Sequence, residues 1–156
     1  MRDIIGRMGR IRLTWPTVLA AALAGAISAA IGACVDAPAS PTVTAPYNQT
    51  DLVLGTGSDA LTGSTLTVDY TGWLYDVSQP ERKGLQFDSS IGRTPFVFTL
   101  GTGQVIRGWD QGIPGMRAGG TRRLVIPPSL AYGDTRSGPI PQNATLVFEI
   151  TLISIQ

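Results

Sequence analysis

Histidine is absent from this 156-residue chain, and cysteine occurs once, as Cys34. Ser-His-Asp and Cys-His nucleophilic systems need a histidine base, and the common zinc sites use histidine or cysteine ligands. The sequence therefore excludes these chemistries, and a lone cysteine excludes an intramolecular disulfide. Paired catalytic carboxylates are also not indicated, because Asp110 and Glu149 share no motif with Asp88. We expect neither a metal nor a cofactor.

Charge is also scarce, since Asp, Glu, Lys and Arg make up 15% of the chain and the net charge is +1. The first 33 residues hold four of the arginines and one acidic residue, so the remainder has 8 basic and 10 acidic residues and a net charge of −2. A nucleic-acid-binding surface needs clustered Lys or Arg. The charge balance therefore argues against nucleic acid as a partner.

A basic head and an alanine-rich apolar run, Val18–Ala33, open the sequence. The run is short for a membrane-spanning helix and is typical of a secretory signal peptide. It ends in Ile31-Gly32-Ala33-Cys34, which resembles the bacterial lipobox, where the cysteine is acylated and becomes the first mature residue. We expect residues 1–33 to be a lipoprotein signal peptide and Cys34 to be lipidated. The alternative is an incidental thiol in an uncleaved anchor.

Residues 34–50 are rich in Pro, Ala, Ser and Thr and show no hydrophobic period. Such a segment has too little apolar mass to fold, so it is predicted to be a flexible tether. With a lipid on Cys34, the tether would hold the rest of the protein on the extracytoplasmic side of a bacterial membrane, either periplasmic or at the cell surface. Residues 51–156 remain for one folded domain with a modest core.

Period-two alternation is clearest over Ser64–Thr71, where Leu66, Val68 and Tyr70 alternate with polar residues. Further strands are predicted at 96–100, 121–126 and 144–155, with glycine and proline between them. Helical character is confined to about 105–112. The prediction is an α+β domain, in which a twisted antiparallel sheet of about five strands wraps around one short helix.

The predicted helix carries Val105, Ile106 and Trp109 on one side, and that apolar side must contact other residues. Aromatic residues are available from separate segments, and Asp88 supplies a carboxylate beside one of them. An indole surrounded by aromatic rings with a few polar groups is typical of a small ligand pocket.

Six blocks of the sequence together resemble the FKBP family of peptidyl-prolyl cis-trans isomerases. The blocks occur in family order and are Asp69-Tyr-Thr-Gly-Trp-Leu74, Gln86-Phe-Asp-Ser-Ser90, Pro95-Phe-Val-Phe-Thr-Leu-Gly101, Val105-Ile-Arg-Gly-Trp-Asp110, Leu130-Ala-Tyr-Gly133 and Asn143-Ala-Thr-Leu-Val-Phe148. The resemblance covers nearly all of residues 51–156. It departs from the compact members at 75–86, where the connection is longer and an extra loop is expected.

The resemblance implies a site of ten residues. Those it places at the reacting imide are Tyr70, Phe87, Asp88, Tyr132 and Phe148, and those it places around the proline are Phe96, Val105, Ile106, Trp109 and Ile140. Trp109 would be the floor, Tyr132 and the Ile106 N–H would hold carbonyls, and Ile140 would belong to a flap. For each aromatic residue the alternative is ordinary core packing, which we favour for Phe98.

The implied function is rotation about X-Pro peptide bonds by non-covalent binding, which would assist the folding of exported proteins. Proline-containing polypeptides would be the substrates, macrolide immunosuppressants would be possible ligands, and the membrane would be contacted through Cys34. A monomer is expected. The alternative function is a proline-peptide-binding module or chaperone with little turnover.

Overall fold

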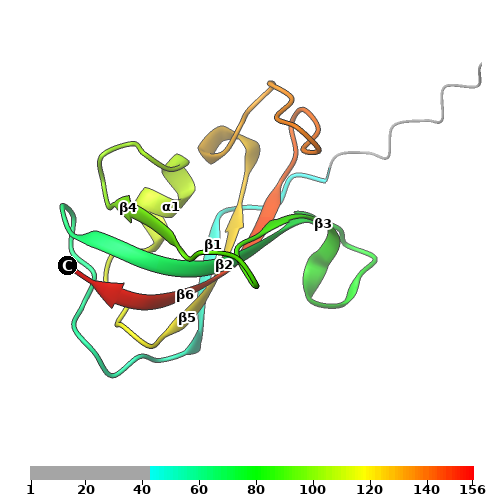
Figure 1. The fold of residues 1–156 in the computed structure, drawn as a ribbon. Helices are drawn as coiled ribbons and strands as arrows, with labels where there is room; N and C mark the ends of the chain where they lie inside the picture. Colours follow the sequence, from blue (N-terminus) through cyan, green and yellow to red (C-terminus); the bar gives the residue numbers. More distant parts are fainter. Residues whose placement is uncertain (1–42) are drawn as a thin grey trace, which may run out of the picture. The chain divides into compact units, whose positions relative to one another are not determined.

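The computed structural model describes residues 43–156, which form a β-sheet with one short α-helix (Figure 1). The strands are β1 (Asn48–Val53), β2 (Thr65–Tyr75), β3 (Lys83–Ser89), β4 (Phe96–Thr99), β5 (Thr121–Ile126) and β6 (Leu146–Ile155). The helix is α1 (Arg107–Gly112), and 3-10 turns occur at Pro80–Arg82 and Pro128–Leu130. The α+β prediction is confirmed.

All six strands join one antiparallel sheet in the order β1-β5-β6-β2-β3, with β4 also paired to β2. The last strand, β6, therefore lies in the middle, between β5 and β2. The long β2 pairs with β3 and β4 at different points of its other edge. The sheet is strongly twisted, and α1 and the segment around residues 127–141 lie on the same side of it (Figure 1).

Alternation along the strands explains which face of the sheet is covered. In β5, Arg122, Leu124 and Ile126 are buried while the residues between them are only partly so. Leu66 and Val68 of β2 and Ile150 and Leu152 of β6 are also fully buried. Period two directs these side chains to one face, and their burial there is the main stabilising contribution.

The helix is six residues long and begins at Arg107, two residues later than the sequence suggested. Glycine at 108 and 112 faces β5 so closely that a methyl group there would collide with Ile126 or Leu124, respectively. These two glycines allow α1 to lie directly on the sheet. Among residues 43–156, no helix is long and apolar enough to cross a membrane.

The structure refines two boundaries drawn from the sequence. The sheet expected to have about five strands has six, and the loop expected over 75–86 is shorter, because the chain pairs with β2 from Lys83 onward. The boundary expected at Asp51 falls inside β1, which pairs with β5 from Asn48. Ordered contacts begin earlier still, since the Ala45 N–H donates to Thr145 Oγ1 at 3.3 Å. The expected signal peptide, residues 1–33, and Cys34 lie outside the described residues.

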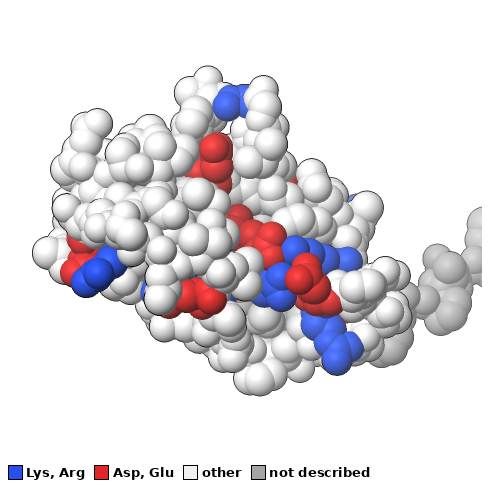
Figure 2. Space-filling model, turned by 90° about the horizontal axis from the view of Figure 1, so that it is seen from below, with Lys and Arg blue, Asp and Glu red and all other residues white. Residues whose placement is uncertain are grey.

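Four charged side chains hold the connection between β2 and β3, residues 76–82, to the sheet. Glu149 of β6 forms ion pairs with Lys83 and Arg123, each at 2.7 Å. Glu81 of the loop pairs with the same two cations at 2.8 and 3.0 Å. Acidic and basic side chains are mixed on this face (Figure 2), and Lys83 also lies 4.7 Å from the centre of the Trp73 ring. The network fixes the loop because each cation is shared by both carboxylates.

We expect Glu149→Gln to lower the free energy of unfolding by about 1–2 kcal/mol, because it leaves two partly buried cations short of a carboxylate. Urea unfolding of the variant and of the parent measures this difference. The matched control is Asp59→Asn, which breaks the exposed Asp59–Arg117 pair and is expected to cost less than about 0.5 kcal/mol. Equal losses in the two variants would contradict the assigned role of the network.

Candidate active site

An apolar cavity of about 380 Å³ opens beside α1. Its walls come from β2, β3, β4, β6, α1, the β4–α1 loop and the loop that follows β5. The residues lining it are Tyr70, Phe87, Asp88, Phe96, Gln104, Val105, Ile106, Trp109, Tyr132 and Phe148. A cavity of this size with aromatic walls and few polar groups suits one small ring and its flanking amides.

Trp109 lies at the centre of the aromatic group. Its ring centre is 5.3 Å from Tyr70 and 5.3 Å from Phe148, at interplanar angles of 78° and 88°. Phe87 meets Phe148 in the same edge-to-face manner, at 5.5 Å and 84°. Edge-to-face pairs place the positive edge of one ring against the negative face of another, which favours this geometry beyond simple burial. The rings therefore hold one another in a fixed cup.

Gly72 makes room for two of these rings. It pairs with Asp88 on β3 and with Phe148 on β6, and a methyl group at Gly72 would lie 2.6 Å from Phe87 and 2.8 Å from Phe148. Contacts this short are sterically forbidden. The absence of a side chain at this one position of β2 therefore allows Phe87 and Phe148 to meet across the strand.

The β4–α1 loop is fixed by side chains that accept backbone hydrogen bonds. Asp110 accepts from the N–H groups of Gly101 at 2.8 Å and Gly103 at 3.1 Å. Both glycines have positive φ, 79° and 73°, which other residues rarely adopt. Gln104 Oε1 accepts from the Thr99 N–H at 3.0 Å. These bonds set the path of the chain that carries Val105 and Ile106 to the cavity.

Asp88 is the carboxylate of the site. Its Oδ2 accepts from the Tyr70 hydroxyl at 2.5 Å, and its Oδ1 accepts from Arg93 at 2.6 Å and from the Ser89 N–H at 2.8 Å. The hydrogen bond from Tyr70 is the main cause that lowers the pKa of Asp88, and Arg93 and Ser89 act in the same direction against burial. Asp88 is therefore ionised at neutral pH and rigidly oriented.

Both tyrosines of the cavity keep their protons far above neutral pH. Burial, followed by the hydrogen bond to Asp88, raises the pKa of Tyr70 to about 12. Burial and the charge of Asp88 also raise the pKa of Tyr132. Within the described residues, Tyr132 Oη and the Ile106 N–H make no hydrogen bond, so both donors are open to a ligand. The cavity thus presents neutral donors at its edge and apolar rings inside.

Nine of the ten predicted site residues line the cavity, although their roles in the reaction remain predictions. Ile140 is not among the lining residues; it is 4% exposed and packs in the hydrophobic core, and its expected place in a flap stays a prediction. In its loop, the backbone groups of Ser137 and Ile140 hydrogen-bond to each other. Phe98 is buried in the core as favoured from the sequence. Gln104 was missed, because a polar residue between Gly103 and Val105 has no distinctive signal.

Among residues 43–156, no group of three or more Cys, Asp or Glu side chains is placed to hold a metal ion. The Trp109 Nε1–H is buried and has no acceptor among these residues. The indole is accordingly held by packing rather than by a hydrogen bond.

Known proteins share both the sequence and the fold of this domain. The chain is 47% identical over 107 residues to an FK506-binding protein of Neisseria meningitidis, a match that covers 67% of this chain and 92% of that protein. The crystal structure of AtFKBP13 aligns with a TM-score of 0.60 and 38% identity, over 74% of this chain and 98% of that one. The crystal structure of FkpA from Escherichia coli gives a TM-score of 0.60 and 37% identity, over 70% and 48%.

The model of the FKBP-type peptidyl-prolyl cis-trans isomerase family matches residues 57–153, which include every residue that lines the cavity. This span is well over half of the chain. The order of motifs, the antiparallel sheet over one short helix and the sequence identities agree. The chain belongs to the FKBP-type peptidyl-prolyl cis-trans isomerases.

Proposed function

We propose that the aromatic cavity is the place where this isomerase rotates X-Pro bonds, with Trp109 beneath the proline ring. The observation that carries the proposal is the cup formed by Trp109, Tyr70 and Phe148, with Asp88 fixed at its edge. A prolyl ring is apolar and compact, and the cavity of about 380 Å³ has room for it and for the neighbouring amides.

The physical basis of the rate enhancement is the change of solvent. Rotation about the imide faces a barrier of roughly 18–20 kcal/mol because amide resonance must be broken. The planar amide is more polar than the twisted one, so a poorly polar cavity stabilises the twisted state relative to the planar state. Lowering the barrier by about 5–7 kcal/mol corresponds to roughly four to five decades in rate. No nucleophile or proton transfer is required.

The polar groups have positioning roles in this proposal. The Ile106 N–H and the Tyr132 hydroxyl are donors at the edge of the cavity and suit the carbonyls that flank the proline. Asp88 faces the rotating carbonyl. Its hydrogen bonds with Tyr70 and Arg93 keep the carboxylate in one orientation. Phe87 and Phe96 complete the walls. The same cavity is proposed to bind FK506, the ligand for which the relatives are named.

The cellular setting is proposed from the N-terminal sequence. Cys34 follows a basic and apolar leader, and only ten residues separate it from Ala45, whose N–H is bonded to Thr145. Ten residues reach at most about 35 Å when fully extended. A lipid on Cys34 would therefore keep the isomerase close to a bacterial membrane, on the extracytoplasmic side, where exported polypeptides emerge unfolded. We propose such polypeptides as its substrates.

Trp109→Ala is expected to lower kcat/KM for a proline tetrapeptide by at least about tenfold, because the floor of the cavity is removed. NMR exchange spectroscopy of cis and trans peptide signals measures the rate directly. FK506 at saturating concentration is expected to inhibit the parent. Ile153→Ala, at an exposed position of β6, is the control and is expected to keep full activity. A Trp109→Ala variant as active as the parent would refute the proposed site, and tight peptide binding without turnover in the parent would favour the binding-module alternative.

The rate is expected to change less than about twofold between pH 5 and pH 9. Asp88 has a lowered pKa and stays ionised throughout, while the pKa of Tyr70 is about 12 and that of Tyr132 is raised. Because the folded pKa of Asp88 lies below its unfolded value, its contribution to stability is complete above pH ~4 and is lost only at more acid pH. The same NMR exchange measurement across this range tests the expectation. A rise or fall of the isomerisation rate with a midpoint near pH 6–7 would contradict it.

Cys34→Ser is expected to move the protein from the membrane fraction to the soluble fraction while leaving peptide turnover unchanged. The physical reason is that acyl chains supply the membrane affinity, at about 0.8 kcal/mol per buried CH₂. Fractionation and mass spectrometry of the N-terminal peptide measure the location and the modification. An unmodified Cys34 in the parent would refute the anchor without affecting the proposed active site.

A further inference from the structure

The position of the indole at the centre of the cavity depends on what holds α1. Trp109 has no side-chain hydrogen bond among the described residues, so its ring follows the helix backbone. A helix of six residues is too short to be stable alone, because nucleation costs more than so few bonds return. Contacts from outside the helix must therefore fix it.

Tyr47 makes one such contact, from a point 61 residues earlier in the chain. Its hydroxyl donates to the Gly108 carbonyl at 3.1 Å, next to Trp109. The ring is partly buried against the core, and a methyl group at Gly112 would collide with the same hydroxyl. Tyr47 thus lies along the glycine face of α1, between the helix and the start of β1. Burial raises the pKa of Tyr47, with Arg122 acting in the opposite sense, so the hydroxyl remains a donor at neutral pH.

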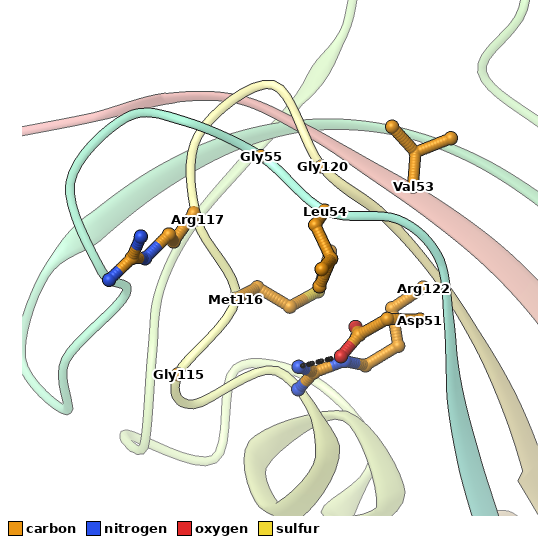
Figure 3. A pocket seen from close by; sticks show the side chains of 9 residues that line it. All are labelled: Asp51, Val53, Leu54, Gly55, Gly115, Met116, Arg117, Gly120 and Arg122. Atoms are coloured by element: carbon orange, nitrogen blue, oxygen red, sulfur yellow. Dashed lines mark hydrogen bonds and ion pairs between the residues drawn. The ribbon is translucent and has the colours of Figure 1, made fainter.

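Arg122 holds the other end of the helix. Its guanidinium donates to the carbonyls of Gly112 at 2.7 Å and Pro114 at 3.2 Å. It also donates to both oxygens of Asp51 in β1, at 2.6 and 3.1 Å. Figure 3 shows Asp51 and Arg122 side by side, with the chain that carries Gly115 and Met116 next to them. With only 8% of its side chain exposed, Arg122 is a buried charge that Asp51 neutralises.

Both ends of α1 are therefore held by the segment Ala45–Asp51. Tyr47 bonds directly to Gly108 at the start of the helix, and Asp51 acts through Arg122 on Gly112 at its end. The tie at Gly108 falls in the first turn, where Trp109 and Asp110 donate their N–H groups to the Ile106 carbonyl. A movement of Gly108 consequently displaces both the indole and the turn that presents the Ile106 N–H. A misplacement of about 1 Å, even from a change far from the reacting atoms, can cost roughly a hundredfold in rate.

We propose that Tyr47 is a positioning residue of the isomerase, which acts through the Gly108 carbonyl to fix Trp109 and Ile106 in the cavity. Arg122, with Asp51, has the matching role at the end of the helix. This inference rests on the proposed function of the cavity. It adds that the segment Ala45–Asp51, most of which was expected to belong to the tether, helps to position the residues of the cavity. Ordinary core packing by Tyr47 would instead affect stability alone.

Tyr47→Phe keeps the ring and removes the hydrogen bond, so it separates these two roles. We expect kcat/KM for a proline tetrapeptide to fall about three- to tenfold, the range for one lost hydrogen bond that acts on the transition state. Faster hydrogen exchange at the Trp109 and Ile113 amides and a shifted Trp109 indole N–H resonance should accompany the loss, whereas the Trp73 resonance should not move. All measurements use the full chain.

The matched control is Thr121→Val, which removes the hydroxyl pair between Thr121 and Thr151 at 2.9 Å, on β5 but away from α1. It is expected to lower the unfolding midpoint similarly while leaving kcat/KM and the Trp109 resonance unchanged. If Tyr47→Phe matches this control in both respects, the positioning role is overturned while a low activity of Trp109→Ala still supports the site. If Trp109→Ala is fully active, the proposed site itself fails.

Discussion

Edge-to-face packing of the Trp109 indole against Tyr70 and Phe148 is the interaction on which the rest of the structure depends. The three residues come from α1, β2 and β6, so the contact joins the helix to the two central strands of the sheet. Gly72 leaves room for the Phe148 ring, and Gly108 and Gly112 let α1 lie close against β5. The same rings supply both burial energy and the wall of a cavity. The aromatic core is thus left open on one side as a cavity, which is the proposed binding site.

The hydrogen bonds at the edge of the cavity fix the orientation of Asp88. Tyr70, Arg93 and the Ser89 N–H all converge on Asp88 and lower its pKa against burial, while burial and then the bond to Asp88 raise the pKa of Tyr70, so both groups move further from neutrality. In acid–base enzymes the opposite arrangement is found, with pKa values adjusted toward the working pH. Fixed charges and an apolar interior agree with a reaction that breaks no covalent bond. Such a reaction needs no histidine as a base, and the sequence contains none.

The sequence predicted the strands with clear alternation, β2, β4, β5 and β6, since period two and β-branched residues mark them. It missed β3, because Lys83–Ser89 contains no β-branched residue and begins directly after a turn with positive φ at Glu81 and Arg82. Family motifs located nine of the cavity residues. Ile140 does not line the cavity, and its expected role in a flap stays a prediction. Tyr47 was assigned to the tether, since nothing local reveals a contact with Gly108.

The central place of β6 has a bearing on biosynthesis. This strand is the last to be made, yet it bridges β5 and β2, and without it the sheet falls into separate pieces. Ribosomes deliver a chain from its N-terminus, so the domain cannot close until nearly all of its residues have emerged. The strands made earlier therefore remain two unconnected groups, β1-β5 and β4-β2-β3, until β6 is available to join them.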